Sequence, residues 1–338
     1  MKIRHLDSSL RTLLVAEIGN NHEGSVDVAH QLVQAAADSG VDIVKFQTFR
    51  TDWFVAKEDS DRFNRLKSFE LSISEFRELS DHAHDLDVAF MSTPLDLNSV
   101  VELTPFVDAF KVASGDNDWH PLIDSICATG RPLVISTGLT DLTAAEKVSR
   151  YVNDQWGRNH QSGQLALLHC VSAYPTPAEA ANVRAITSMQ SIQGCEIGYS
   201  DHTLGTSACL AAIALGATIV EKHFTLDKTY SSFRDHLLSA DPDEMRELVD
   251  AALHLQQILG DGKKVISACE EGLAESVRRG IYADRSLSEG HRVEMGDLRW
   301  LRPRHEFGSG QESDVLGKLT SRAIAEGEPF DSRSVEQS

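Results

Sequence analysis

The stretch GATIVEKHFTLDK, residues 216–228, starts as a buried strand and runs directly into three ionisable side chains. Residues 218–220 are β-branched, and no turn residue separates them from Glu221, Lys222 and His223. Because side chains alternate along a strand, Glu221 and His223 share one face and Lys222 lies on the other. Polar side chains at the carboxyl end of a buried parallel strand are typical of the catalytic face of a β/α barrel.

The same arrangement recurs throughout residues 1–260, where apolar runs alternate with amphipathic segments. The expected strands cover residues 13–19, 42–49, 88–94, 109–114, 132–137, 165–170, 195–201 and 218–224. One of the intervening helices is marked by a capping box, Ser72 with Glu75. Eight strand–helix units in about 250 residues predict a (β/α)8 TIM barrel. A doubly wound open sheet is the alternative, but neither GxGxxG nor GxxxxGK[ST] occurs to favour it.

The character of the sequence changes after the predicted barrel. Residues 261–276 are polar and glycine-containing, which predicts a linker. Residues 277–338 contain short β-like pieces that twice end in Glu-Gly, and they predict a small β-rich domain.

Charge and cysteine content narrow the class of protein. The formal net charge of the 338 residues is −19, which argues against nonspecific nucleic-acid or membrane partners. The five cysteines show no CxxC spacing, so neither a zinc knuckle nor a disulfide framework is indicated. The first residues lack the apolar stretch of a signal peptide, and the longest apolar run is too short to cross a bilayer. We therefore expect a cytoplasmic protein.

Two histidines follow neighbouring predicted strands and share the faces expected to point inward. His202 ends the seventh strand and His223 ends the eighth. Neighbouring strands are about 4.8 Å apart, so these two imidazoles can hold one ion. Imidazole with oxygen co-ligands suits Mn²⁺, Zn²⁺ or Fe²⁺. A hydrogen-bonded histidine pair without metal is the alternative.

Two lysines within predicted strands are the second feature. Burial of Lys45 and Lys111 requires compensating negative charge. Glu17 and Glu221 can supply it. The other interpretation is a phosphate or carboxylate ligand held by both lysines and by the hydroxyls of Ser114, Ser136 and Ser200. An anion beside a divalent metal suggests carbon–oxygen or carbon–carbon chemistry on a small phosphorylated or carboxylated molecule.

Six ordered blocks carry a family resemblance: VAEIGNNHEGS, DIVKFQTF, AFKVASGD, LLHCVSAYPTP, GYSDHTLG and IVEKHFTLDK. Together they resemble the sialic acid synthase family, which makes N-acetylneuraminate, legionaminate or pseudaminate. The tail, from RRGIYADRSLSEGHRV to LTSRAIAEGEPF, resembles the small antifreeze-like (SAF) domain that these synthases carry after the barrel.

The resemblance implies a reaction. Phosphoenolpyruvate would condense with the open-chain form of an N-acylated hexosamine, N-acetylmannosamine or a 2,4-diacetamido-trideoxyhexose, to give a nonulosonic acid and phosphate. A divalent metal ion, Mn²⁺ ahead of Mg²⁺ or Co²⁺, would polarise the sugar aldehyde. The resemblance also implies a domain-swapped homodimer, in which Arg302 of one subunit reaches the active site of its partner.

The resemblance also assigns roles to individual residues. Glu17 is the expected proton-handling catalytic residue, His202 and His223 are the expected metal ligands, and Glu221 is expected to support them. The phosphoenolpyruvate-binding positions are Lys45, Thr93, Lys111, Ser114, Ser136, Ser172 and Ser200. The sugar-binding positions are Gln47, Asp116, Tyr174, Asp235 and Arg302. Ser172 stands where some relatives have Asn, and Asp116 stands where some have Glu.

Two other functions remain open at this point. A metal-dependent aldolase or isomerase on the same barrel would release no phosphate. A non-catalytic sugar-binding scaffold would bind ligand without turnover.

Overall fold

The computed structural model describes residues 1–158 and 163–336, and the chain divides into two compact units. The first unit is Met1–Gly260 and the second is Asp261–Ser338. Each unit has a hydrophobic core of its own.

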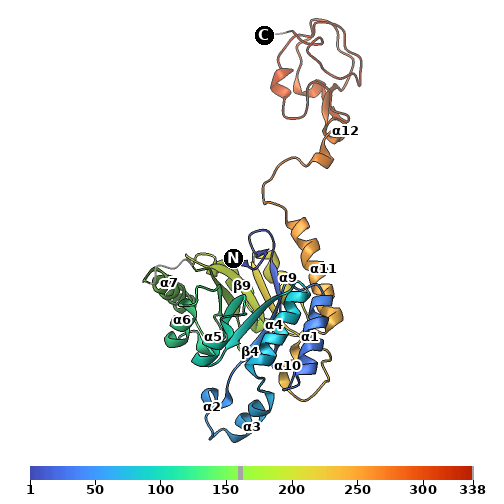
Figure 1. Ribbon diagram of the computed structural model, residues 1–338. Coiled ribbons are helices and arrows are strands. Elements are labelled where there is room, and N and C mark those ends of the chain that lie inside the picture. The colour runs from blue at the N-terminus through green and yellow to red at the C-terminus, as the bar shows by residue number, and fades with distance from the viewer. Residues whose placement is uncertain (159–162, 337–338) are drawn as a thin grey trace. The chain divides into compact units, whose positions relative to one another are not determined.

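Eight parallel strands of the first unit close into a barrel, in the order β10-β3-β4-β5-β6-β7-β8-β9 (Figure 1). The strands are β3 (Leu13–Gly19), β4 (Ile43–Thr48), β5 (Ala89–Pro94), β6 (Ala109–Val112), β7 (Leu133–Ser136), β8 (Leu165–Cys170), β9 (Glu196–Asp201) and β10 (Ile219–His223). Closure between the first and last of these strands, β3 and β10, confirms the predicted (β/α)8 barrel and excludes the open sheet.

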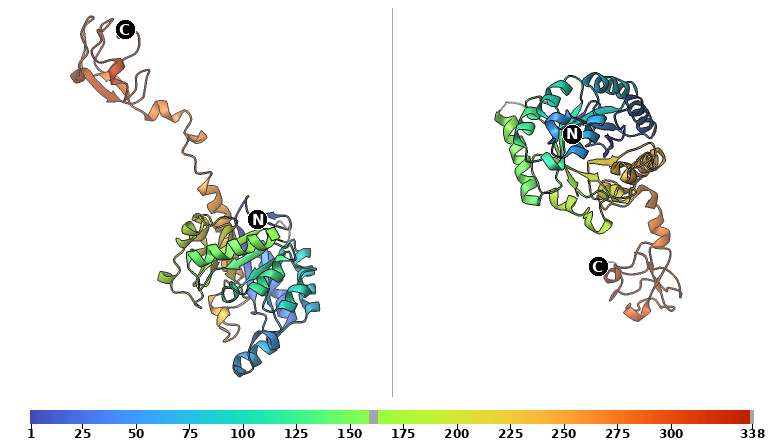
Figure 2. Two further views of the ribbon diagram at one scale, coloured as in Figure 1. Left: turned by 90° about the vertical axis from the view of Figure 1, so that its left-hand side faces the viewer. Right: turned by 90° about the horizontal axis from the view of Figure 1, so that it is seen from below.

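Helices surround the strands, as the end-on view in Figure 2 shows. They are α1 (Val26–Asp38), α4 (Ile73–Asp85), α5 (Leu97–Leu103), α6 (His120–Cys127), α7 (Leu142–Arg158), α8 (Ala185–Met189), α9 (Ser207–Ala214) and α11 (Pro242–Leu259). The predicted capping box begins α4: Glu75 N–H donates to Ser72 Oγ at 3.3 Å, and Ser72 N–H donates to the Glu75 carboxylate at 2.5 Å. Among the described residues, no helix is long and apolar enough to cross a membrane.

The inside of the barrel is apolar at the amino-terminal ends of the strands. Leu13, Val15 and Ile43 belong to a buried cluster there, together with residues of the other strands. A short hairpin, β1 (Lys2–Ile3) and β2 (Leu6–Asp7), adds further apolar side chains to that cluster. The polar side chains that the sequence analysis singled out lie at the opposite, carboxyl ends of the strands.

An insertion between β4 and α4 lies beyond the strand ends (Figure 1). It contains α2 (Thr51–Phe54) and α3 (Ser60–Phe69). Leu66 and Phe69 of α3 pack in a small apolar cluster, and the Phe69 ring meets the Phe233 ring edge to face at 5.4 Å. Phe233 directly precedes α10 (Arg234–Leu238), so two loops from distant parts of the sequence are joined at this rim.

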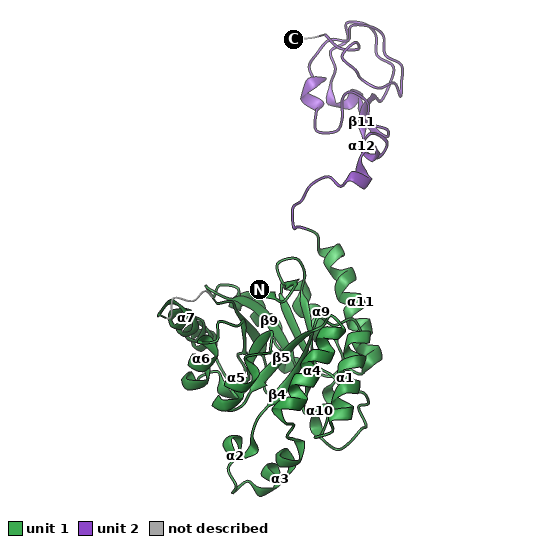
Figure 3. Ribbon diagram, in the orientation of Figure 1, with its two compact units in different colours: residues 1–260 green, residues 261–338 purple. Residues whose placement is uncertain are grey.

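The second unit, purple in Figure 3, is small. In it, β11 (Gly280–Ala283) pairs with β12 (Leu298–Leu301) as antiparallel strands. Its core contains Ile281, Leu298 and Phe330. The predicted linker, residues 261–276, is exposed and contains all but the last residue of the short helix α12 (Leu273–Val277).

Candidate active site

A cavity of about 490 Å³ lies at the carboxyl ends of the barrel strands. Most of the predicted site residues line it: Glu17, Lys45, Gln47, Thr93, Lys111, Ser114, Ser136, Tyr174, Ser200, His202, Glu221, His223 and Asp235. Ser172 and Asp116 are not in its wall. Arg302 belongs to the second unit and directly follows β12, and its role at a partner's active site stays a prediction.

Lys45 lies between two carboxylates on the cavity floor. Its Nζ is 3.1 Å from Glu17 Oε2 and 3.0 Å from Glu221 Oε2, and all three side chains are almost fully buried. Lys111 Nζ donates to Ser136 Oγ at 2.7 Å and lies 3.5 Å from Glu221 Oε1. Two lysines and two glutamates thus form a charge-balanced group, and both carboxylates proposed to neutralise the lysines do contact them.

The pKa values of Glu17 and Glu221 are shifted in opposite directions. Burial raises the pKa of Glu17, and Lys45 only partly opposes this effect. Burial by itself would also raise the pKa of Glu221. Lys111 and Lys45, together with Ser200, nevertheless hold this pKa below its ordinary value. The difference follows from the contacts: Glu221 receives two ammonium groups and the Ser200 hydroxyl, at 2.8 Å, whereas Glu17 receives one ammonium group and the Gln47 amide, at 3.2 Å. Glu221 is therefore a fixed anion, and Glu17 is the carboxylate better able to exchange a proton.

Several polar atoms in or beside this cavity are buried without a hydrogen-bond partner among the described residues. They include Thr93 Oγ1, Ser172 Oγ and His223 Nδ1. Unsatisfied buried polar groups are uncommon and call for an explanation. Of these three residues, Thr93 and His223 line the cavity, where a bound ligand would supply the missing partner.

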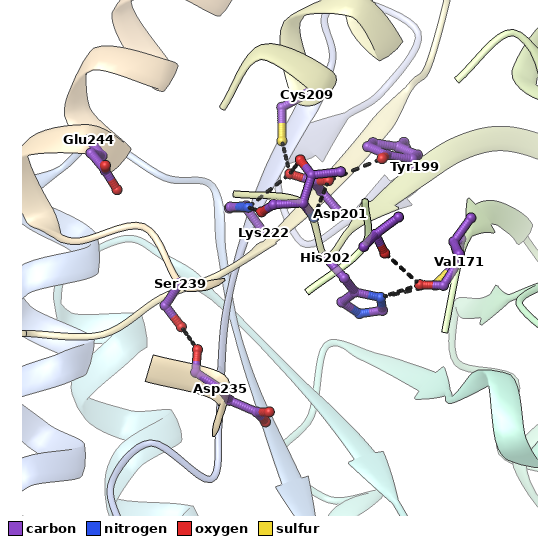
Figure 4. A network of polar contacts seen from close by, with 12 residues as sticks. Val171, Tyr199, Asp201, His202, Cys209, Lys222, Asp235, Ser239 and Glu244 are labelled. Atoms are coloured by element: carbon purple, nitrogen blue, oxygen red, sulfur yellow. Dashed lines mark hydrogen bonds and ion pairs between the residues drawn. The ribbon is translucent and has the colours of Figure 1, made fainter. Parts of the chain in front are cut away.

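His202 and His223 come together as the alternation of side chains predicted. Their ring centroids are 5.3 Å apart, and Tyr174 covers the His202 ring at 4.0 Å. His202 Nδ1 lies 2.8 Å from Val171 O, so that N–H donates to the carbonyl and the other ring nitrogen is left with its lone pair (Figure 4). Burial lowers the pKa of both histidines, which favours neutral imidazoles.

This pair fits a divalent metal ion. Metal binding requires neutral imidazole, and a backbone carbonyl on the second ring nitrogen is a common support for a ligand histidine. In the described part of the chain, no group of three or more His, Cys, Asp or Glu side chains is arranged to hold a metal ion. Water or substrate oxygens would therefore complete the coordination. Glu221 is bonded to Ser200 and the lysines, so its support of the histidines stays a prediction.

Tyr174, Gln47 and Asp235 stand on the outer wall of the cavity. Gln47 donates to Glu17 and accepts from the Asn20 amide at 2.9 Å, so Asn20 also belongs to the site. Burial raises the pKa of Asp235. The Arg234 guanidinium lies over the Tyr174 ring at 4.7 Å and pairs with Asp235 at 3.3 Å.

The sequence prediction missed the residues that the rim contributes. Arg62 and Arg65 of α3 line the cavity, as do Phe54 and Phe233. Arg62 lies over the Phe54 ring at 5.4 Å, and neither arginine has a carboxylate partner among residues 1–158 and 163–336. The (i, i+3) spacing of the two arginines places them on one face of α3, but only the folded insertion shows that this face meets the cavity.

Lys222 points away from the cavity, as predicted. It pairs with Asp201, whose carboxylate also receives Cys209 of α9 (Figure 4).

Residues 32–264 match the model of the NeuB family. The chain is 38% identical to an uncharacterized protein of Methanocaldococcus jannaschii, over 95% of this chain and 92% of the relative. It is 36% identical to the N,N'-diacetyllegionaminic acid synthase of Legionella pneumophila, over 96% and 95% of the two chains. The crystal structure of an N-acetylneuraminic acid synthetase from Leptospira borgpetersenii superposes with a TM-score of 0.71 at 30% identity, covering 77% of this chain and 89% of that one.

Proposed function

The chain is an enzyme that belongs to the NeuB family, and we propose that it condenses phosphoenolpyruvate with an open-chain N-acylated hexosamine to give a nonulosonic acid and phosphate. The observation that carries this proposal is one cavity that combines the Lys45–Glu17–Glu221 group with the His202–His223 pair. The first is suited to an anionic substrate and proton transfer, and the second to a Lewis acid.

Phosphoenolpyruvate would lie over the floor of the cavity. Lys45 and Lys111 supply charge, and the buried Thr93 hydroxyl has no hydrogen-bond partner within the described part of the chain. Ser114, Ser136 and Ser200 add hydroxyls around them. Because Glu17 and Glu221 already balance the lysines, Arg62 and Arg65 at the rim provide the further positive charge that draws a trianion into a protein of net charge −19.

The acceptor sugar would lie nearer the rim, against Gln47, Tyr174 and Asp235. His202 and His223 would hold the metal ion, with Mn²⁺ as the first choice and Mg²⁺ or Co²⁺ as alternatives. When bound, such an ion polarises the aldehyde as a Lewis acid.

The chain's own groups then account for the proton movements. C3 of phosphoenolpyruvate attacks the aldehyde carbon, water adds at C2, and the resulting intermediate loses phosphate. Glu17 exchanges protons during these steps, because burial raises its pKa above that of an ordinary carboxyl group. Glu221 stays ionised and holds Lys45 and Lys111 in place.

The proposal is tested by incubating the protein with Mn²⁺, phosphoenolpyruvate and a panel of N-acylated hexosamines, and by measuring inorganic phosphate and the sugar-acid product. We expect phosphate release that depends on one of the sugars. An aldolase or isomerase would turn over sugar without releasing phosphate, and a scaffold would bind without turnover. If no member of the panel gives sugar-dependent phosphate, the synthase assignment fails for those acceptors.

The second unit is proposed to be an SAF domain that completes the partner's site in a domain-swapped homodimer. Arg302 is the residue proposed to cross over. Mixing Arg302→Ala protein with Glu17→Ala protein should then restore part of the activity, because a hybrid dimer contains one site with both residues. Inactive mixtures, with subunit exchange verified by differently tagged chains, would contradict completion by the partner. Cytoplasmic location and the absence of nucleic-acid or membrane partners also stay predictions.

A further inference from the structure

A buried ion pair lies behind the two histidines, on the opposite face of their strands. Asp201 directly precedes His202, and Lys222 directly precedes His223. Lys222 Nζ is 2.8 Å from Asp201 Oδ2, and the two side chains are 1% and 0% exposed. Asp201 and Lys222 are also register partners in the pairing of β9 with β10. The pair therefore ties together the two strands that carry the histidines, one residue before each histidine.

The Asp201 carboxylate is fully occupied (Figure 4). Oδ1 accepts from Tyr199 Oη at 3.0 Å and from Thr203 N–H at 2.9 Å. Oδ2 accepts from Lys222, from Thr203 Oγ1 at 3.2 Å and from Cys209 Sγ at 3.4 Å. All of these side chains come from β9, β10, α9 or the start of the loop that leaves β9.

These contacts involve the residues directly before and directly after His202. Asp201 on one side of it is bonded to Lys222, and Thr203 on the other side donates to Asp201 and accepts from Lys222 through its carbonyl oxygen. The backbone on both sides of His202 is thus anchored to the residue that precedes His223. The Val171 carbonyl then sets the rotation of the His202 ring.

Stability alone does not explain the pair. Replacing a buried ion pair by apolar residues of similar volume is often neutral or stabilising, because desolvating two charges is costly. A directional pair does fix strand register, and a slip of one residue would turn every side chain to the other face of the strand. At this place, a slip would remove one histidine from the cavity.

We propose that Asp201 and Lys222 are positioning residues that hold His202 and His223 at the separation at which both imidazoles bind one divalent ion. This inference rests on the metal role given to the histidines in the proposed function. Neither Asp201 nor Lys222 lines the cavity, so they act through the strands that carry the ligands.

The test compares Mn²⁺ affinity in the full chain by titration calorimetry, at a temperature where circular dichroism shows every variant folded. The double variant Asp201→Asn/Lys222→Met removes the ion pair without leaving a lone buried charge. We expect its Mn²⁺ dissociation constant to rise by about 10- to 100-fold, the range found when groups that orient metal ligands are removed. Lys222→Arg keeps the charge and should bind more tightly than the double variant.

Arg11→Gln/Asp42→Asn is the matched control, because it removes an ion pair at the amino-terminal end of the barrel. This control should leave Mn²⁺ affinity unchanged even if the melting temperature falls. Should the double variant fail to fold, Tyr199→Phe removes one bond to Asp201 and is expected to weaken Mn²⁺ binding a few-fold.

The outcomes distinguish failure of the metal-binding role of the histidines from failure of the positioning role of Asp201 and Lys222. If the wild-type protein binds no Mn²⁺, the metal role in the proposed function fails and the inference fails with it. If the wild type binds Mn²⁺ and the folded double variant, or Tyr199→Phe in its place, binds it equally well, only the positioning role is overturned.

Discussion

Replacing either His202 or His223 by alanine is expected to abolish turnover and to remove measurable Mn²⁺ binding. Each histidine is half of the protein's contribution to the proposed site, since no group of three or more such ligands exists in the described ranges. Loss of Lewis-acid stabilisation amounts to several kcal/mol, which corresponds to a rate reduction of about 10³-fold or more. The measurements are phosphate release under saturating substrates and Mn²⁺ titration of each variant.

His169→Ala provides the matched control for this experiment. His169 lies on the adjacent strand β8, but its Nε2 contacts the Ala181 carbonyl oxygen at 2.9 Å and it does not line the cavity. This variant should lose some stability and keep its Mn²⁺ affinity. Full activity in His202→Ala or His223→Ala would refute the ligand assignment.

Replacing Lys45 by methionine is expected to destabilise the fold and to eliminate activity. The change would leave Glu17 without its ammonium partner. Among the residues that the structure describes, Lys111 would then be the one ammonium group left beside the two buried carboxylates, in contact with Glu221. Removing one partner of a buried ion pair typically costs about 3–5 kcal/mol in the free energy of unfolding. Urea unfolding followed by circular dichroism measures this cost.

The pH dependence of the stability of Lys45→Met shows whether the loss comes from the unpaired Glu17 carboxyl group. Burial already raises the pKa of Glu17, and removing Lys45 takes away the strongest of the groups that lower this pKa. A carboxyl group whose pKa is higher in the folded state than in the unfolded state binds more protons when folded, so its contribution to stability falls as the pH rises. The deficit of Lys45→Met relative to wild type should therefore be smaller at acidic pH than above neutrality.

A second substitution tests whether the loss of stability comes from unbalanced charge and not from a packing defect at Lys45. Lys45→Met/Glu221→Gln removes one of the two carboxylates that face the lost ammonium group, so part of the stability should return while activity stays absent. A double variant no more stable than Lys45→Met would contradict the charge-balance explanation.

Much of the fold was predictable because its signals are local. Near-continuous apolar runs, helical periodicity and the capping box at Ser72 depend on neighbouring residues in the chain, and the structure has them where the sequence placed them. The inward faces were also predictable, since alternation along β9 and β10 is a property of each strand alone. Glu221 and His223 accordingly line the cavity, and Lys222 does not.

Contacts between strands and loops were decided by the tertiary structure. The register of β3 with β4 shifts between Glu17 and Gly19, and no pattern in the sequence predicts this irregularity. Arg62 and Arg65 belong to an insertion whose position depends on the packing of Phe69 against Phe233, residues distant in sequence.

The sequence by itself determined the strands, the side chains at their carboxyl ends and the faces on which those side chains lie. Only barrel closure decided that Lys45 sits between Glu17 and Glu221, that the two histidine rings stand 5.3 Å apart, and that Ser172 and Asp116 remain outside the cavity wall. The physical reason is that alternation fixes direction along one strand, whereas distances across the barrel depend on stagger and curvature, which arise when all eight strands close together.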